Sequence, residues 1–258
     1  LVSITERIKI NGVDLTEADF ARLATRVRQT AERLLDEGKL TYTPTYFEQV
    51  TAIGLLAFAE SDVELAILET GLGGRLDATN VVHPKICILT PIELEHTQFL
   101  GNTIEKIAGE KAGIIKDEIP VISAEQKPDA AAVFIQKAQK HHTKITFVQD
   151  LISSCIFNYT GDSLKNDTCL ESLSSNAIKM NIKISSPLFK RPLQAALRLL
   201  GKIQMQNAAL ASCAVKSILP DIDEAVIERG LEKAYLPGRF EVVHKNLVLD
   251  GAHTVNSI

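Results

Sequence analysis

The apolar residues of this chain recur with two different spacings, which alternate along the sequence. In several segments an apolar residue returns every three or four positions, as on one face of an amphipathic helix, and short apolar runs of strand length separate these segments. The pattern predicts helices over residues 16–38, 46–60, 103–115, 128–142, 204–218 and 223–234, and buried strands over residues 63–68, 86–90, 120–123 and 144–148. Because alternating helices and strands are typical of crossover connections, we predict an α/β fold with a mostly parallel, doubly wound sheet flanked by helices.

Two parts of the chain depart from this alternation. Residues 151–186 are rich in serine and asparagine, and apolar and polar side chains alternate over residues 177–184, which predicts antiparallel strands in a small side sheet. Near the end of the chain a linker containing proline and glycine precedes two more apolar runs. We therefore predict one domain over residues 1–236, with residues 237–258 forming the linker and the start of a second domain.

The first predicted helix carries boundary signals at both ends. Thr16 begins the pattern Thr-Glu-Ala-Asp, which is typical of a capped helix start, and Gly38 follows the last apolar position of the helical face. Upstream, the pair Asn11-Gly12 predicts a tight turn within an extended segment.

Composition narrows the possible partners. Lysine and arginine number 28 against 32 aspartate and glutamate residues, a formal net charge of -4 that offers no general attraction to nucleic acid. The four cysteines are far apart in the sequence and lack metal-site or disulfide-framework spacing, as expected for reduced cysteines of a cytoplasmic protein: Cys87, Cys155, Cys169 and Cys213. Charged residues interrupt every apolar stretch before the roughly 20 residues needed to cross a bilayer, so we expect no membrane segment.

The strongest chemical signal is Glu69, which closes the apolar run over residues 63–68. Three glycines, Gly71, Gly73 and Gly74, follow it within five positions. A carboxylate at the carboxyl end of a parallel strand lies where α/β sheets bind ligands, and Mg²⁺ prefers such oxygen ligands. The alternative is an ordinary helix cap or surface carboxylate.

His96 follows the next predicted strand, over residues 86–90. A neutral imidazole there can complete a metal site whose other ligands are oxygens. The alternative is a loop histidine that is hydrogen-bonded to the backbone, and the residues alone favour that alternative.

Five separated segments together carry a family resemblance: ETGLGGRLDATN at 69–80, EHT at 95–97, EKAGIIK at 110–116, LPGRFEVV at 236–243 and LDGAH at 249–253. In this order they resemble the folylpolyglutamate synthase/dihydrofolate synthase family of the Mur-ligase superfamily. The resemblance implies a Mur-ligase-like central ATP-binding domain. It also implies an ATP-dependent ligase that joins L-glutamate to dihydropteroate or to tetrahydrofolate through an acyl phosphate.

The resemblance also implies two Mg²⁺ sites. It assigns Glu69 to one ion, and His96 with Lys111 to the other. Lysine on a helix is ordinarily a solvated cation and no metal ligand, but the family carbamylates this lysine and so converts it into an oxygen ligand. Glu95 stands where the family usually has aspartate, which lengthens the carboxylate beside His96. Lys111 and His253 are the residues to which the resemblance gives catalytic roles.

Further roles follow for ATP and for the pterin-bearing substrate. Residues implied to contact ATP, a co-substrate here, are Asn207, Arg239 and Asp250; residues implied to contact the pterin-bearing substrate are Thr45, Tyr46, Phe47, Glu48, Leu76, Asp77 and Ala78. Flat aromatic side chains suit a pterin ring, although Tyr46 and Phe47 equally fit a helix start with core residues. Ile203 replaces a histidine of the family's motif before Asn207.

The sequence contains no G-x-x-x-x-G-K-S/T phosphate loop. We therefore expect an internal fragment that lacks the phosphate loop and most of the second domain and is inactive alone. The expected partners of a monomeric parent are small molecules, namely dihydropteroate or folate, glutamate and ATP, with no nucleic acid and no membrane. Two alternatives remain: another amide ligase of the superfamily, such as a muramoyl-peptide ligase, and a non-catalytic fragment.

Overall fold

The structure is a computed structural model that describes residues 3–160, 178–244 and 247–251. The chain forms two compact units, Leu1–Val82 and His83–Ile258, which are described in turn. Among the described helices, none is both long and apolar enough to pass through a bilayer.

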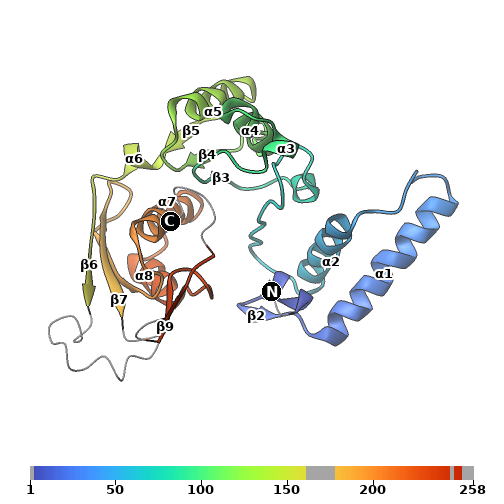
Figure 1. Ribbon diagram of the computed structural model, residues 1–258, viewed down its shortest axis with the longest axis horizontal. Helices are drawn as coiled ribbons and strands as arrows, with labels where there is room; N and C mark the ends of the chain where they lie inside the picture. The colour runs from blue at the N-terminus through green and yellow to red at the C-terminus, as the bar shows by residue number, and fades with distance from the viewer. Residues whose placement is uncertain (1–2, 161–177, 245–246, 252–258) are drawn as a thin grey trace. The chain divides into compact units, whose positions relative to one another are not determined.

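The first unit is a short hairpin with two packed helices. A 3₁₀ turn, Ile4–Arg7, precedes strands β1 (Lys9–Ile10) and β2 (Val13–Asp14), which pair antiparallel around the predicted Asn11-Gly12 turn. Helices α1 (Glu17–Asp36) and α2 (Tyr46–Glu60) lie against each other (Figure 1). Four buried apolar residues form the core cluster of this unit: Ile8 before β1, and Leu23, Ile53 and Ala57 from the two helices.

Both helices begin where the sequence signals them. The Thr16 hydroxyl accepts the Asp19 N–H, which caps α1. At α2 the Thr45 hydroxyl accepts the Glu48 N–H, and the Glu48 carboxylate accepts the Thr45 N–H in return. The sequence-based predictions of both helices are therefore confirmed.

The predicted strand over residues 63–68 is absent, and this prediction was wrong. The segment is irregular, and its apolar side chains Leu65 and Ile67 are 49% and 87% exposed. A parallel strand needs a neighbouring strand for its backbone hydrogen bonds and cover on both faces. Within the described residues no strand pairs with this segment, so the apolar run remains without a ladder.

A parallel sheet forms the centre of the second unit. Strands β3 (Cys87–Leu89), β4 (Val121–Ser123) and β5 (Ile145–Phe147) lie in that order, each parallel to its neighbour. Helices α4 (Ile104–Lys111) and α5 (Pro128–Lys140) pack together against one face, where Phe134 and Ile107 are completely buried.

Helix α7 (Lys202–Ile218) covers the other face. It contacts β4 of the parallel sheet and also β6 of a second sheet (Figure 1). Helices on both faces of parallel strands confirm the predicted α/β fold. Two short helices, α3 (Thr97–Leu100) and α6 (Val148–Leu151), and the 3₁₀ turn η3 (Ala112–Ile114) complete the connections of this unit; the 3₁₀ turn η2 (Ala78–Val81) belongs to the first unit.

The second sheet is antiparallel and confirms the predicted side sheet. Its strands are β6 (Ser154–Thr160), β7 (Lys179–Ser185) and β8 (Leu193–Leu197), in that order. Strand β8 was not predicted, although its burial alternates as expected for a half-buried strand. Two strands near the end of the chain, β9 (Glu241–His244) and β10 (Leu247–Leu249), pair antiparallel. They are formed by the two apolar runs that follow the linker.

Helix α8 (Glu224–Lys233) protects the outer edge of β8. The Glu228 carboxylate accepts the Gln194 N–H at 2.7 Å, and the Glu232 carboxylate accepts the Ala196 N–H at 3.3 Å. Unpaired N–H groups at a sheet edge can recruit other strands, so these two carboxylates satisfy groups that would otherwise remain open.

A buried ion pair joins α7 to α8. Lys216 Nζ lies 3.0 Å from Glu224 Oε1, and the two side chains are only 5% and 6% exposed. The ammonium also donates to the Ile222 carbonyl at 2.7 Å, and Glu224 accepts the Lys190 N–H at 3.1 Å. The pair is therefore hydrogen-bonded on both sides, which is the condition under which buried charges are tolerated.

Candidate functional site

In the first unit, Asp77 organises the glycine-rich loop. Its Oδ2 accepts the N–H groups of Gly71 and Leu72 at 3.0 and 2.9 Å, and its Oδ1 accepts the Thr79 N–H and hydroxyl at 3.0 and 2.6 Å. Asp77 also caps η2. The loop conformation is thus set by one carboxylate.

Phe47 lies directly on this loop. A Cβ atom added at Gly71 would come within 2.5 Å of the Phe47 ring, so only glycine fits there with the ring in this position. The contact brings the start of α2 next to the loop that carries Leu76 and Asp77. Two segments that the resemblance assigns to the pterin-bearing substrate therefore lie together within one unit.

Some side chains in these two segments bond to each other, and others are exposed to solvent. Thr45 and Glu48 bond to each other, and the Thr45 N–H lowers the pKa of the Glu48 carboxyl. Tyr46 and Leu76 are instead 57% and 81% exposed, so Tyr46 is no core residue. Ala78 is the first residue of η2.

In the second unit, Lys111 approaches the loop that follows β3. Its Nζ lies 3.7 Å from Glu95 Oε1, and both side chains are partly buried. The next residue, His96, has a left-handed backbone (φ 51°) and begins α3 with an exposed side chain. The end of α4 and the loop carrying His96 therefore meet. Glu69 belongs to the first unit.

Among the described residues, the Glu95 carboxylate is the side chain in contact with Lys111 that could bind a metal ion. No group of three His, Cys, Asp or Glu side chains gathers anywhere in the described residues. Glu95 and His96 offer an oxygen and a nitrogen, whereas an ammonium at Lys111 would repel a cation. A carbamate on the same nitrogen would be an oxygen ligand of the kind that Mg²⁺ prefers.

Gln126, which the sequence analysis missed, holds the loop after β3 in place. Its Oε1 accepts the Ile92 N–H at 3.0 Å, and its Nε2 donates to the Thr90 carbonyl at 2.9 Å. The same Nε2 donates to Ser123 Oγ at 3.1 Å at the end of β4. One amide thus links the ends of two neighbouring strands, directly before Glu95 and His96.

Replacing Gln126 with alanine should loosen this loop. The Ile92 N–H and Thr90 carbonyl lose their partner, which we expect to cost about 1–3 kcal/mol of unfolding free energy. Hydrogen exchange should accelerate at Ile92, and thermal unfolding should shift down. Gln136, exposed on α5, provides the matched control, and Gln136→Ala should change neither property. Equal effects of the two variants would contradict the role given to Gln126.

The residues that the resemblance assigns to ATP are spread over several elements of the second unit. Arg239 and Asp250 line one shallow, open depression with Leu236, Pro237, Gly238, Leu249 and Gly251. The Gly251 N–H donates to the Gly238 carbonyl at 2.7 Å, which holds the two sides of this depression together. Asn207 lies exposed on α7, and His253 falls outside the described residues.

The described cysteines Cys87, Cys155 and Cys213 are free. Burial raises the pKa of the Cys87 thiol to about 11 and that of the Cys213 thiol to about 12. These two thiols therefore remain protonated and unreactive at neutral pH. Cys169 falls outside the described residues.

Comparison with known proteins places this geometry in a family. The Mur ligase middle domain matches residues 15–215. The chain belongs to this family. It is 36% identical over 265 aligned residues to a dihydrofolate synthase/folylpolyglutamate synthase of Bacillus subtilis, and the match covers 100% of this chain and 57% of that protein. The chain thus spans little more than half the length of this relative.

Solved structures agree with the sequence comparison. The apo form of L. casei FPGS superposes with a TM-score of 0.85 at 28% identity, and the match covers 99% of this chain and 60% of that one. An FPGS-AMPPCP-folate complex gives a TM-score of 0.85 at 27% identity, with 99% and 59% covered. The fold and the resemblance inferred from the five sequence segments are confirmed.

Proposed function

We propose that the chain is the central ATP-binding part of a ligase that adds L-glutamate to dihydropteroate, to tetrahydrofolate, or to both. The observation that carries this proposal is the match along the entire chain to a dihydrofolate synthase/folylpolyglutamate synthase. The contact between Phe47 and the Asp77-held loop supports it, because this contact joins two segments assigned to one substrate. In this proposal residues 1–236 form the ligase domain, and residues 237–258 lead into the next.

The proposed reaction has two steps. A carboxylate oxygen of the folate substrate attacks the γ-phosphorus of ATP, and ADP leaves. The glutamate amine then attacks the acyl carbon, loses a proton and releases inorganic phosphate. Both steps depend mainly on positioning and on stabilising the negative charge of the phosphates.

Several assigned residues have a specific part in this proposal. Phe47 and Tyr46 would hold the pterin ring by its faces, while Asp77 keeps the loop beneath it in shape. Arg239 would offset charge on the phosphates from the linker side, together with Asn207 and Asp250 as nucleotide contacts. We retain His253 as a proposed catalytic residue on the strength of the LDGAH segment.

Bound Mg²⁺ would neutralise phosphate charge, and Glu69 on one side and His96 with Lys111 on the other are the residues proposed to hold two such ions. The neutral Lys111 amine would add to CO₂ and release a proton, and this gives the carbamate oxygen ligand.

Substrate choice tests the proposal. Purified protein of full natural length should form ADP in the presence of glutamate together with dihydropteroate or tetrahydrofolate. A muramoyl-peptide substrate of the related cell-wall ligases should give no ADP above background. If only the muramoyl-peptide substrate gives ADP, the chain belongs to another branch of the superfamily. If neither substrate gives ADP, the non-catalytic alternative is favoured.

Size-exclusion chromatography of the same preparation checks the proposed monomer, and cell fractionation checks the proposed cytoplasmic location.

A further inference from the structure

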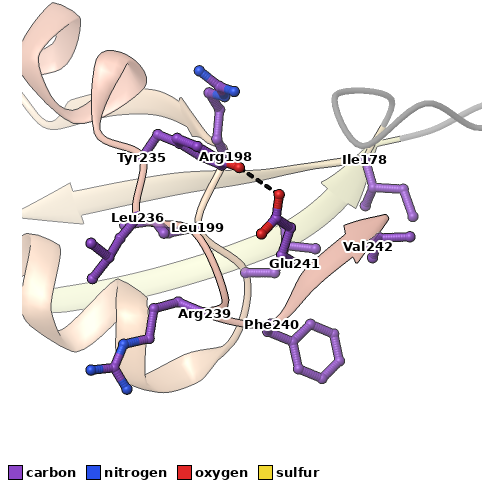
Figure 2. A pocket seen from close by; sticks show the side chains of 10 residues that line it. Ile178, Arg198, Leu199, Tyr235, Leu236, Arg239, Phe240, Glu241 and Val242 are labelled. Carbon is purple, nitrogen blue, oxygen red and sulfur yellow. Dashed lines mark hydrogen bonds between the residues drawn. The ribbon is translucent and has the colours of Figure 1, made fainter. Parts of the chain in front are cut away.

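The linker before β9 is held by a cluster of three side chains from different parts of the second unit. Glu241 Oε1 accepts the Tyr235 hydroxyl, and Glu241 Oε2 accepts the Gly238 N–H at 2.8 Å (Figure 2). The Arg198 guanidinium lies 4.3 Å from the centre of the Tyr235 ring. One carboxylate therefore joins the segment after α8, the linker turn and the first residue of β9.

The backbone of this turn is unusual at the residue between Arg239 and Glu241. Phe240 has a φ of 47°, in the left-handed region that bulky residues rarely adopt, and Gly238 has a φ of 70°. In a regular strand, residues two positions apart share a face, so Arg239 and Glu241 would lie side by side and pair. The left-handed backbone of Phe240 interrupts this two-residue alternation of a strand.

The side chains follow the backbone. Figure 2 shows the Arg239 guanidinium pointing away from the Glu241 carboxylate, which is turned toward Tyr235. Both Glu241 oxygens are already engaged, by a hydroxyl and by a backbone N–H. The cluster thus keeps the nearest carboxylate in the sequence from neutralising Arg239.

We propose that Glu241 is a positioning residue for Arg239: by binding Tyr235 and the Gly238 N–H, it fixes the turn that presents the guanidinium to the phosphates of a nucleotide. This inference rests on the proposed function, in which Arg239 meets ATP. It adds Glu241, Tyr235 and Arg198 to the machinery as residues that act through Arg239.

Removing the charge of Glu241 should change nucleotide binding in one direction if Glu241 acts only through its charge, and in the opposite direction if it positions Arg239. The inference is therefore testable. A carboxylate near a phosphate site repels the anion, so removing its charge should strengthen nucleotide binding if charge is all that matters. Positioning predicts weaker binding, because glutamine carries no charge and its amide nitrogen accepts no hydrogen bond, so the two charge-assisted hydrogen bonds of Glu241 are weakened.

The experiment uses the protein of full natural length and measures the KM for ATP and for the folate substrate. Glu241→Gln should raise the KM for ATP about tenfold, as expected for a weakened charge-assisted contact, and leave the folate KM unchanged. Asp221→Asn removes the same charge from an exposed site of the same unit and should not raise the KM for ATP. In an Arg239→Ala background, Glu241→Gln should add less than about a twofold effect, since the two residues act as one unit.

A second readout reports on the cluster itself. The hydrogen bond to Glu241 raises the pKa of Tyr235, so in Glu241→Gln this tyrosine should ionise at lower pH. Ultraviolet titration measures this shift, and Tyr235→Phe identifies the signal. An unshifted Tyr235 in Glu241→Gln would overturn the inference.

The kinetic outcomes separate the two proposals. If Arg239→Ala leaves the KM for ATP unchanged, Arg239 does not contact the nucleotide, and the proposed ATP site fails together with the positioning role. If Arg239→Ala raises this KM but Glu241→Gln does not, the positioning inference alone is wrong. A full effect of Glu241→Gln in the Arg239→Ala background would also overturn it.

Discussion

Replacing Glu69 with alanine should lower kcat about 100-fold or more in the protein of full natural length, while the KM for the folate substrate stays nearly constant. The reason is that Glu69 is proposed to hold a Mg²⁺ ion that stabilises charge developing on the transferred phosphoryl group, and such interactions act mainly in the transition state. Steady-state kinetics with ATP and folate titrated separately provide the measurement. Glu64→Ala, an exposed carboxylate five positions upstream, serves as the control and should leave kcat unchanged.

Phe47→Ala should show the reverse pattern. Loss of the ring from the Gly71 loop should weaken folate binding by about 1–3 kcal/mol and raise its KM, with ATP kinetics spared. If Glu69→Ala and Phe47→Ala show the same kinetic defect, neither residue serves a separate site. Phe47 would then be a packing residue of the first unit.

Replacing Lys216 with methionine should cost about 3–5 kcal/mol of unfolding free energy, because the Glu224 carboxylate stays buried without its cation. Chemical denaturation of the second unit measures this loss. Arg191→Met removes a cation that is 48% exposed from its pair with Glu228 on α8, and should cost less than Lys216→Met, because Glu228 keeps the Gln194 N–H as a partner. A double variant, Lys216→Met with Glu224→Leu, should recover most of the loss, since it leaves no buried charge.

The Lys216–Glu224 pair should make the free energy of unfolding depend on pH in the acidic range. The Lys216 ammonium, and after it the Lys190 N–H, lowers the pKa of Glu224 from 4.5 to about 2. A carboxyl with a lowered native pKa stabilises the fold above its unfolded pKa, so the contribution is complete above pH 4.5 and is lost as the pH falls toward 2. Denaturation free energies over this range should fall less steeply in Glu224→Gln. An unchanged slope would contradict the lowered pKa.

Helix positions were predictable because their signals are local. Thr16 and Thr45 cap helices through residues three positions away, and the α2 boundaries match the prediction. Strands depend on distant partners instead. The apolar run over residues 63–68 met every local criterion for a strand yet has no ladder among the described residues. Strand β8 was missed because it consists mainly of leucine and alanine, which favour helices.

The candidate site also contains residues that the sequence identifies and residues that depend on distant partners. Motif residues such as Glu69, His96 and Arg239 could be selected from the sequence through family resemblance. The residues that hold them could not, because their contacts join distant segments: Gln126 meets Ile92 across 34 positions. Glu241 is near Arg239 in sequence, but its role depends on the left-handed Phe240, which no local pattern announces.

The central claim is ligation through an acyl phosphate, and isotope transfer tests it most directly. The folate substrate, labelled with ¹⁸O in the carboxyl group that receives glutamate, is incubated with ATP, glutamate and the protein of full natural length. An acyl-phosphate mechanism predicts one ¹⁸O atom in each released inorganic phosphate, because the carboxylate oxygen that attacks ATP leaves with the phosphate. Phosphate free of ¹⁸O, with glutamate joined to the product, would exclude an acyl-phosphate intermediate.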